Sequence, residues 1–374
     1  MKHIISHSSR LRDTPFTAGV EAAGVKSYTV YNHMLLPTVF ENVEFDYHHL
    51  KSHVQVWDVS VERQVELNGL DASKLMQMLT PRDLGKMQSD QCYYVPIVDN
   101  KGKMLNDPVA IKHSNTRWWI SIADSDVLLW VKGLALGAGL NVDVFEPDVS
   151  PLAVQGPKSD TLMERVFGNE VHNIRFFRQK RLKFADTSFI VSRSGYSKQG
   201  GYEIYVENSQ YGMALWDDLF KAGKDLNVRP GCPNLIERIE GGLLSYGNDM
   251  NMENTPLECG LGRFCKPAED VDHIGKEALA LEIKQGPLRQ IRAVSILGEA
   301  IVPPRTAWPL LKDGVQVGQV TSAAWSPDFE TNVAIGMVDA QHWNPGTELS
   351  VETPQGSRIA CVEERFWKLN IKHF

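Results

Sequence analysis

The sequence predicts an α+β protein with antiparallel sheets, followed by a separate small β-domain. Up to about residue 280, helical and strand-like segments alternate without the regular strand–helix beat of a doubly wound sheet. After that point, short β-rich runs are separated by Pro-Pro, Asp-Gly, Pro-Gly and Gln-Gly turns. The chain has 374 residues, which is long enough for two or three domains, and it carries no internal repeat that would indicate a solenoid.

Apolar residues at helical spacing predict helices over 71–79, 125–136, 209–222 and 233–244. Strict alternation predicts strands over 118–123 and 202–207. The second of these strands places Glu203 and Tyr205 on one face of its sheet. The C-terminal part predicts strands over 291–296, 315–321, 333–338, 348–352 and 359–364.

The composition is that of an ordinary folded protein, with 43% hydrophobic and 23% charged residues. The net charge of −7 disfavours a long nucleic-acid track. No apolar run approaches the length of a membrane span, and residues 1–7 lack the apolar core of a secretory signal, so we expect a cytoplasmic protein. The five cysteines are scattered and have no histidine at metal spacing, so reduced thiols and no metal site are expected.

Several nucleotide and hydrolase motifs are missing from the sequence. No Gly-x-Gly-x-x-Gly lies between a strand and a helix, which makes built-in flavin or nicotinamide chemistry unexpected. There is also no phosphate-binding Gly-x-x-x-x-Gly-Lys loop, no Gly-x-Ser-x-Gly elbow and no His-Glu-x-x-His helix. The sequence therefore lacks the motifs that usually indicate a kinase, a serine hydrolase or a zinc protease.

The most informative stretch, residues 192–204, predicts a strand, a Gly-rich turn and a returning strand. Its glycines permit close backbone approach to a flat ligand, and Glu203 is an acceptor at the mouth of the returning strand. The alternative is a plain hairpin with a solvated glutamate. Three further stretches stand out: 237–243, 246–249 and 255–261.

Together these stretches resemble the folate-binding aminomethyltransferase family, the T-protein of the glycine cleavage system and its relatives. Other matching segments follow in the family's order: 57–60, 106–107, 155–158, 238–240, 318–322 and 326–327. The resemblance covers nearly the whole chain and implies a three-domain T-protein-like fold with a C-terminal Greek-key β-barrel domain. The implied domains are residues 1–50 with 145–230, residues 51–144 with 231–280, and residues 281–374.

Within that family, residues 28–37, 91–96 and 197–202 look most like the branch that demethylates dimethylsulfoniopropionate. The glycine-cleavage enzyme has paired acids where this chain has Asn106 and Asp107, and acids in the Gly-rich turn where it has Lys198 and Gln199. This loss of negative charge suits a sulfonium, because its methyl group can leave without a base.

The resemblance implies methyl transfer from dimethylsulfoniopropionate to N5 of tetrahydrofolate, giving 5-methyltetrahydrofolate and 3-(methylthio)propionate without redox change. The implied partners are the sulfonium and the folate, with no nucleic acid and no membrane. The alternatives are a folate-dependent C1-transferase acting on an amine, such as an aminomethyltransferase, and a non-catalytic folate-binding regulator. The sequence leaves the oligomeric state open, a homodimer among the options.

A sulfonium favours aromatic faces over a tight carboxylate pair. The candidates for binding the substrate are three tyrosines and, for its carboxylate, a lysine or a serine: Tyr31, Tyr94, Tyr196, Lys198 and Ser121. The alternatives are tyrosines that pack with their hydroxyls in water and a solvated Lys198.

For the folate, a carboxylate can accept two adjacent pterin donors at once, and the resemblance gives Glu203 this role. Tyr205, Gln155 and Arg238 are the other folate candidates, although Arg238 could instead pair with Glu240 or Glu237. No acid–base catalyst is expected, and the residues expected to position the reacting nitrogen are Asn106 and Asp107. The basic run 173–184 could bind polyglutamate or nucleic acid, but such a run is usually a solvated face.

Overall fold

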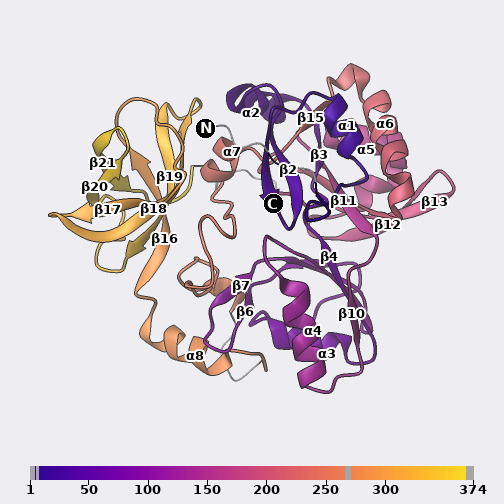
Figure 1. Ribbon diagram of the computed structural model, residues 1–374, viewed down its shortest axis with the longest axis horizontal. Coiled ribbons are helices and arrows are strands. Elements are labelled where there is room, and N and C mark those ends of the chain that lie inside the picture. The colour runs from indigo at the N-terminus through magenta and orange to yellow at the C-terminus, as the bar shows by residue number, and fades with distance from the viewer. Residues whose placement is uncertain (1–4, 6–7, 266–270, 368–374) are drawn as a thin grey trace. The chain divides into compact units, whose positions relative to one another are not determined.

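The computed structural model describes residue 5, residues 8–265 and residues 271–367 (Figure 1). The chain forms two compact units. Unit 1 comprises residues 1–64, 146–195 and 199–234, and unit 2 comprises residues 65–145, 196–198 and 235–374. Of the opening seven residues, from which the absence of a secretory signal was inferred, only residue 5 lies within the described part. The three-domain division stays a prediction.

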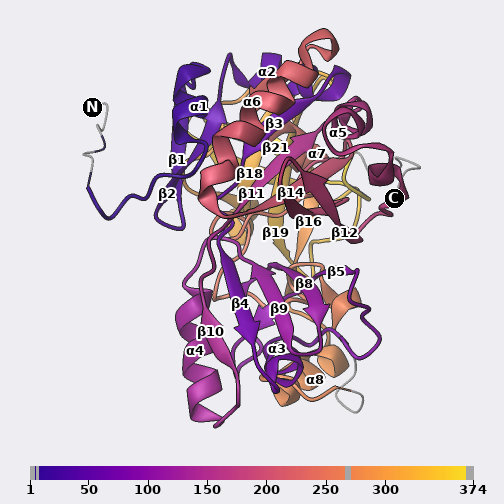
Figure 2. The same ribbon diagram turned by 90° about the vertical axis from the view of Figure 1, so that its right-hand side faces the viewer.

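Unit 1 is built on a six-stranded sheet in the order β12-β13-β14-β11-β3-β15, antiparallel except where β15 joins β3. Helices α5 and α6 pack together, and α5 lies against β11, β12 and β14 (Figure 2). The strands of unit 1 are β1 (Ser27–Tyr31), β2 (Met34–Val39), β3 (Gln55–Asp58), β11 (Val149–Gln155), β12 (Gln179–Phe184), β13 (Thr187–Ser192), β14 (Gly201–Glu207) and β15 (Arg229–Gly231). Its helices are α1 (Thr17–Ala22), α2 (Val43–Ser52), α5 (Ser159–Phe167), α6 (Gly212–Ala222) and the short 3-10 turns η1 (Asn169–Asn173), η2 (Ser209–Tyr211) and η3 (Lys224–Leu226).

Strand β14 positions the candidate folate residues by simple alternation. Tyr202, Ile204 and Val206 enter the apolar core of unit 1. Successive side chains of a strand point to opposite faces, so Glu203 and Tyr205 lie on the other face, as the sequence predicted. In register, Glu203 is opposite Ser192 of β13 and Ala153 of β11.

Unit 2 contains a five-stranded sheet in the order β10-β4-β9-β8-β5, on which α3 packs against β9 and α4 against β10. The strands of this part are β4 (Gln64–Asn68), β5 (Cys92–Tyr94), β6 (Ile97–Val98), β7 (Met104–Asn106), β8 (Val109–Ser114), β9 (Arg117–Ser121) and β10 (Asp143–Phe145). The helices of unit 2 are α3 (Ala72–Leu79), α4 (Val127–Gly137), α7 (Leu235–Glu240), α8 (Lys276–Gln285) and the 3-10 turn η4 (Gly262–Phe264). Pairing of β5 with β8 sets Tyr94 opposite Val109, two residues after Asp107.

The predicted C-terminal β-domain is confirmed as a closed antiparallel barrel in the order β16-β19-β18-β17-β20-β21 (Figure 1). Its strands are β16 (Arg289–Ile296), β17 (Trp308–Lys312), β18 (Val315–Ser326), β19 (Thr331–Asp339), β20 (Glu348–Thr353) and β21 (Gly356–Val362). The five predicted strands all lie in this barrel, and β17 is an additional strand that the sequence patterns missed. Helix α7 packs against β18 and β19, which connects the segment that contains Arg238 to the barrel.

The four predicted helices exist, and one of them is shorter than predicted. Helix α7 ends at Glu240 rather than at residue 244. Two consecutive glycines follow, and Gly242 has a φ of +64°, a left-handed conformation that stops the helix. Within the described parts of the chain, no helix combines the length and the apolar character that crossing a membrane requires.

Candidate functional site

Glu203 is a buried carboxylate surrounded by hydroxyl groups of unit 1, with only 6% of the residue exposed. Ser194 donates a hydrogen bond through Oγ to Oε2 of Glu203, and the Tyr205 hydroxyl lies 3.5 Å from the same oxygen. Burial raises the pKa of Glu203, against the lowering effect of the hydroxyls of Ser194, Tyr205 and Ser192. The alternative of a solvated glutamate is therefore wrong.

The Gly-rich turn before Glu203 is held by Gln155. Its Nε2 donates to the carbonyl oxygens of Ser194 at 3.1 Å and Tyr202 at 3.3 Å. A Cβ on Gly195 would lie 2.1 Å from Gln155 Nε2, and one on Gly201 would lie 2.6 Å from it. Only glycine at these two positions lets Gln155 approach the turn. Gln155 in turn holds the turn that leads into Glu203.

Asp107 and Tyr94 form the second candidate group, in unit 2. The Tyr94 hydroxyl donates to Oδ2 of Asp107 at 2.8 Å. The other oxygen, Oδ1, is buried and has no hydrogen-bond partner among the described residues. Burial raises the pKa of Asp107 to about 7, with the charge of Asp249 adding to the rise and the Tyr94 hydroxyl opposing it. An aspartate in this state can offer Oδ1 to a donor on a ligand.

The raised pKa of Asp107 predicts how stability depends on pH. The folded protein holds this proton up to about pH 7, whereas the unfolded chain releases it near pH 4. The contribution of this proton to the free energy of unfolding is thus fully present below about pH 4 and is lost as the pH rises to about 7. Asp107→Asn lacks this titration. Its free energy of unfolding, relative to that of wild type, should therefore rise by up to about 4 kcal/mol between about pH 4 and pH 7. Urea unfolding at pH 4.5 and 7.5 measures the difference, and parallel curves would contradict the assignment.

Asn106, the neighbour of Asp107, is engaged by the protein itself. Its Nδ2 donates to the carbonyl of Ala123 at 3.0 Å and to Ser125 Oγ at 2.8 Å, and its Oδ1 accepts the Ala123 N–H at 2.9 Å. Both ends of the amide therefore fasten β7 to the segment after β9. Asn106 holds the backbone that presents Asp107.

Arg238 lies within a buried polar network of unit 2. Its Nη1 donates to Asp249 Oδ2 at 2.8 Å, and its Nη2 donates to Ser322 Oγ at 2.7 Å. Ser322 in turn donates to the other oxygen of Asp249 at 2.6 Å. The alternative pairing of Arg238 with Glu240 or Glu237 is therefore wrong, because the partner comes from the loop after α7. Whether Arg238 also contacts folate stays a prediction.

Replacing Arg238 with methionine should cost about 3 to 5 kcal/mol of unfolding free energy. The change leaves the Asp249 carboxylate buried without its cation, and 0% of that side chain is exposed. Arg305→Met is a matched control, because Arg305 is exposed and makes no ion pair among the described residues. Chemical denaturation of both variants measures the costs. Equal, small losses would mean that the pair contributes no stability.

The tyrosine candidates differ in their surroundings. Tyr196, in unit 2, donates its hydroxyl to the carbonyl oxygens of Leu243 at 3.0 Å and Leu244 at 2.7 Å. The hydroxyls of Tyr94 and Tyr196 are therefore bonded within the protein and do not point into water. Tyr31 ends β1 in unit 1, directly before a tight turn.

The two candidates for the substrate carboxylate lie in unit 2. Ser121 is 3% exposed at the end of β9, in register with Val109. Lys198 is half-buried, and its backbone N–H donates to Oε1 of Glu237 at 2.7 Å. Burial lowers the pKa of the Lys198 amine, Glu237 raises it and Arg263 lowers it further. Lys198 is therefore not an ordinary solvated lysine.

Sequence reasoning missed a third buried carboxylate, Asp58 at the end of β3. Thr14 donates to its Oδ2 at 2.5 Å, and Ser60 Oγ donates to its Oδ1 at 2.7 Å. Burial raises the pKa of Asp58, and these hydroxyls oppose the rise. The segment 57–60 had been noted as a family match, but no spacing pattern links Asp58 to Thr14, which lies 44 residues earlier.

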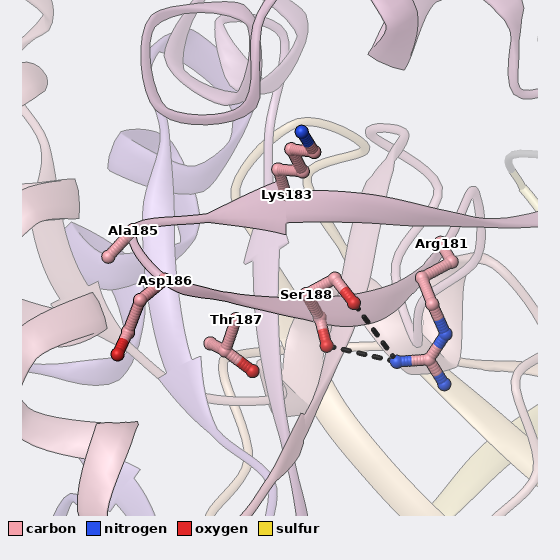
Figure 3. A pocket seen from close by; sticks show the side chains of 6 residues that line it. All are labelled: Arg181, Lys183, Ala185, Asp186, Thr187 and Ser188. Carbon is pink, nitrogen blue, oxygen red and sulfur yellow. Dashed lines mark hydrogen bonds between the residues drawn. The ribbon is translucent and has the colours of Figure 1, made fainter.

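Two of the five basic residues in the run 173–184 pair with acids of the same unit. Lys180 pairs with Glu170 at 2.5 Å, and Arg181 pairs with Glu207 at 2.6 Å. Figure 3 shows a pocket at the tip of the β12–β13 hairpin, where Arg181 Nη1 also donates to the Ser188 carbonyl at 2.9 Å. Basic side chains on an edge strand such as β12 also protect it from pairing with other chains. The pocket contains none of the predicted site residues.

Comparison with known proteins adds two family matches. Residues 16–269 match the GCVT N-terminal domain, and residues 289–366 match the glycine cleavage T-protein C-terminal barrel domain. Among solved structures, the glycine cleavage system aminomethyltransferase T from Bartonella henselae has a TM-score of 0.85 at 22% identity, covering 96% of this chain and all of that one. This likeness supports the fold.

Two curated relatives span nearly the whole chain. The chain is 63% identical over 361 residues to dimethylsulfoniopropionate demethylase DmdA of Ruegeria pomeroyi, covering 96% of this chain and 98% of the relative. It is 28% identical over 345 residues to an aminomethyltransferase of Caldanaerobacter subterraneus, covering 90% of this chain and 91% of the relative. The similarity to the demethylase is thus more than twice as high.

Proposed function

Because the chain belongs to the glycine cleavage T-protein family, we propose that it is a tetrahydrofolate-dependent demethylase of dimethylsulfoniopropionate. The products are 5-methyltetrahydrofolate and 3-(methylthio)propionate, and no redox change occurs. The activity named for the Ruegeria pomeroyi relative supports this substrate, because 63% identity extends over nearly the full length of both chains. We place the reaction in the cytoplasm.

The observation that best supports the proposal is the unpaired oxygen of the Asp107 carboxyl group. Its Oδ1 is buried and has no hydrogen-bond partner among the described residues, while Tyr94 fixes Oδ2. Leaving a buried acceptor unpaired costs about 1 to 3 kcal/mol, so a ligand donor at Oδ1 would recover that cost. The N–H of a reduced pteridine is such a donor. We assign Asp107 the role of orienting this N–H, and Asn106 the role of holding the backbone behind Asp107.

We assign Glu203 the role of binding the pterin ring. Its carboxylate is held by Ser194 and Tyr205 and can accept two adjacent N–H donors in a charge-assisted pair. When bound, tetrahydrofolate supplies N5 as the nucleophile that accepts the methyl group. Gln155 supports the turn beside Glu203. We assign it an indirect role, in which it holds this turn in place for the ligand.

The half-buried rings of Tyr94 and Tyr196, both of unit 2, are assigned to the sulfonium. Tyr31 of unit 1 stays a further candidate. Each aromatic contact with a cation contributes about 0.5 to 2 kcal/mol. The departing sulfide is neutral and needs no proton, and the proton that N5 loses on methylation is released to water. The protein's main contribution is therefore alignment. Ordering two reactants in this way can lower a barrier by about 7 to 11 kcal/mol.

A substrate comparison tests this function. The protein is incubated anaerobically with tetrahydrofolate and either dimethylsulfoniopropionate or an aminomethyl donor, and the folate products are separated by chromatography. The proposal expects 5-methyltetrahydrofolate from the sulfonium alone. Product from the amine alone would make the protein an aminomethyltransferase, and tight folate binding without turnover would make it a folate-binding regulator.

A further inference from the structure

Two arginines of unit 2 lie against one aromatic ring, and a nearby lysine feels the charge of one of them. We name Arg82, Lys198 and Arg263 the cationic cluster. The guanidinium carbon of Arg82 lies 4.6 Å from the centroid of the Phe264 ring, and that of Arg263 lies 4.6 Å from the same centroid. Arg82 also lies 4.0 Å from the centroid of the Tyr93 ring. Two arginines thus share one aromatic platform.

The two arginines of this cluster lack an acidic partner, because neither Arg82 nor Arg263 forms an ion pair with a carboxylate among the described residues. Burial, the largest cause, and the nearby charge of Arg263 both lower the pKa of Arg82. Burial likewise lowers the pKa of Lys198, with Glu237 opposing and Arg263 adding. Arg82 and Lys198 are half-buried and Arg263 is exposed. Neighbouring cations that repel one another are stabilised when an anion binds between them.

Two members of the cluster are held in place by the backbone. Nη1 of Arg82 donates to the carbonyl of Tyr94 at 2.6 Å. The stem of Lys198 lies along Gly241, where an added Cβ would come within 2.7 Å of Lys198 Cγ. Any larger residue at position 241 would therefore displace Lys198. The cluster is thus an ordered group and differs from a set of freely moving surface cations.

We propose that the cationic cluster is a carboxylate-binding site for one of the two reactants. Arginine forks bind carboxylates through two parallel hydrogen bonds, and a lysine adds a compact charge. Both reactants of the proposed function, on which this inference rests, carry carboxylates: the sulfonium on its propionate arm and the folate on its glutamates. Position 241 becomes a specificity position, because its glycine is what lets Lys198 reach the site.

Arg263→Met tests the site, because Arg263 is exposed and makes no hydrogen bond or ion pair with the residues that the structure describes. The matched control is Arg305→Met, and Arg263→Lys should restore most of the effect. The probes are tetrahydropteroyl monoglutamate and pentaglutamate in equilibrium titrations, and dimethylsulfoniopropionate in steady-state assays. Loss of one charge-assisted contact should weaken binding of the correct probe about 10-fold.

The arms of the experiment distinguish the source of the carboxylate. If the pentaglutamate loses affinity and the monoglutamate does not, the cluster binds the folate tail. If KM for dimethylsulfoniopropionate rises about 10-fold with kcat and folate affinity unchanged, the cluster binds the substrate arm. The proposal is overturned if all three values stay within about twofold of the Arg305→Met control. The folate titrations require no methyl donor, so they test the cluster even if the proposed function fails.

Discussion

Replacing Asp107 with alanine should lower kcat about 100-fold or more, whereas Asp107→Asn should stay within about 10-fold of wild type. Alanine removes both the acceptor that orients the reacting nitrogen and the anchor that Tyr94 holds at 2.8 Å. Asparagine keeps an oxygen acceptor and nearly the same shape. Single-turnover formation of 5-methyltetrahydrofolate, with saturating sulfonium, measures the chemical step for each variant.

The comparison between the two Asp107 variants decides the role of this residue. If asparagine loses as much activity as alanine, then Asp107 acts through its charge or by taking a proton. A pKa of about 7 would allow such proton transfer near neutral pH, and kcat of wild type would then rise as pH passes that value. Tyr94→Phe is the matched control, because it removes only the hydrogen bond to Oδ2 and should cost less than Asp107→Ala.

Replacing Glu203 with alanine should weaken tetrahydrofolate binding about 100-fold, or about 3 kcal/mol, because the pterin donors lose a charged acceptor. Glu207→Ala is a matched control, since Glu207 lies on the same strand but pairs with Arg181 at the sheet surface. Isothermal titration under anaerobic conditions gives both affinities. Unchanged affinity in Glu203→Ala would place the pterin elsewhere.

The structure also explains why the sheet face of Glu203 could be predicted from the sequence. Alternation along residues 202–207 separates the core side chains from Glu203 and Tyr205, and this period-2 pattern depends only on local geometry. The five predicted barrel strands were equally accessible, because turns with glycine or proline bounded each one. Strand β17 was missed, since Pro309 interrupts its pattern.

Contacts between distant segments could not be predicted in this way. Asp107 meets Tyr94 because β5 pairs with β8, and nothing in either segment encodes that pairing. Arg238 pairs with Asp249 across a loop, whereas the sequence offered Glu240 or Glu237 as its partner. Glu240 instead accepts a hydrogen bond from Ser326 of the barrel at 2.5 Å. Sequence spacing gives neighbours within an element, and tertiary pairing decides the rest.

The most direct test of the central claim follows one methyl group through the reaction. Dimethylsulfoniopropionate carrying ¹³C in its S-methyl groups is mixed with excess protein and tetrahydrofolate, and the products are observed by NMR. The account predicts one labelled methyl on N5 of the folate and the other on 3-(methylthio)propionate, in equal amounts. Labelled 3-(methylthio)propionate without labelled 5-methyltetrahydrofolate, or no conversion at all, would contradict it.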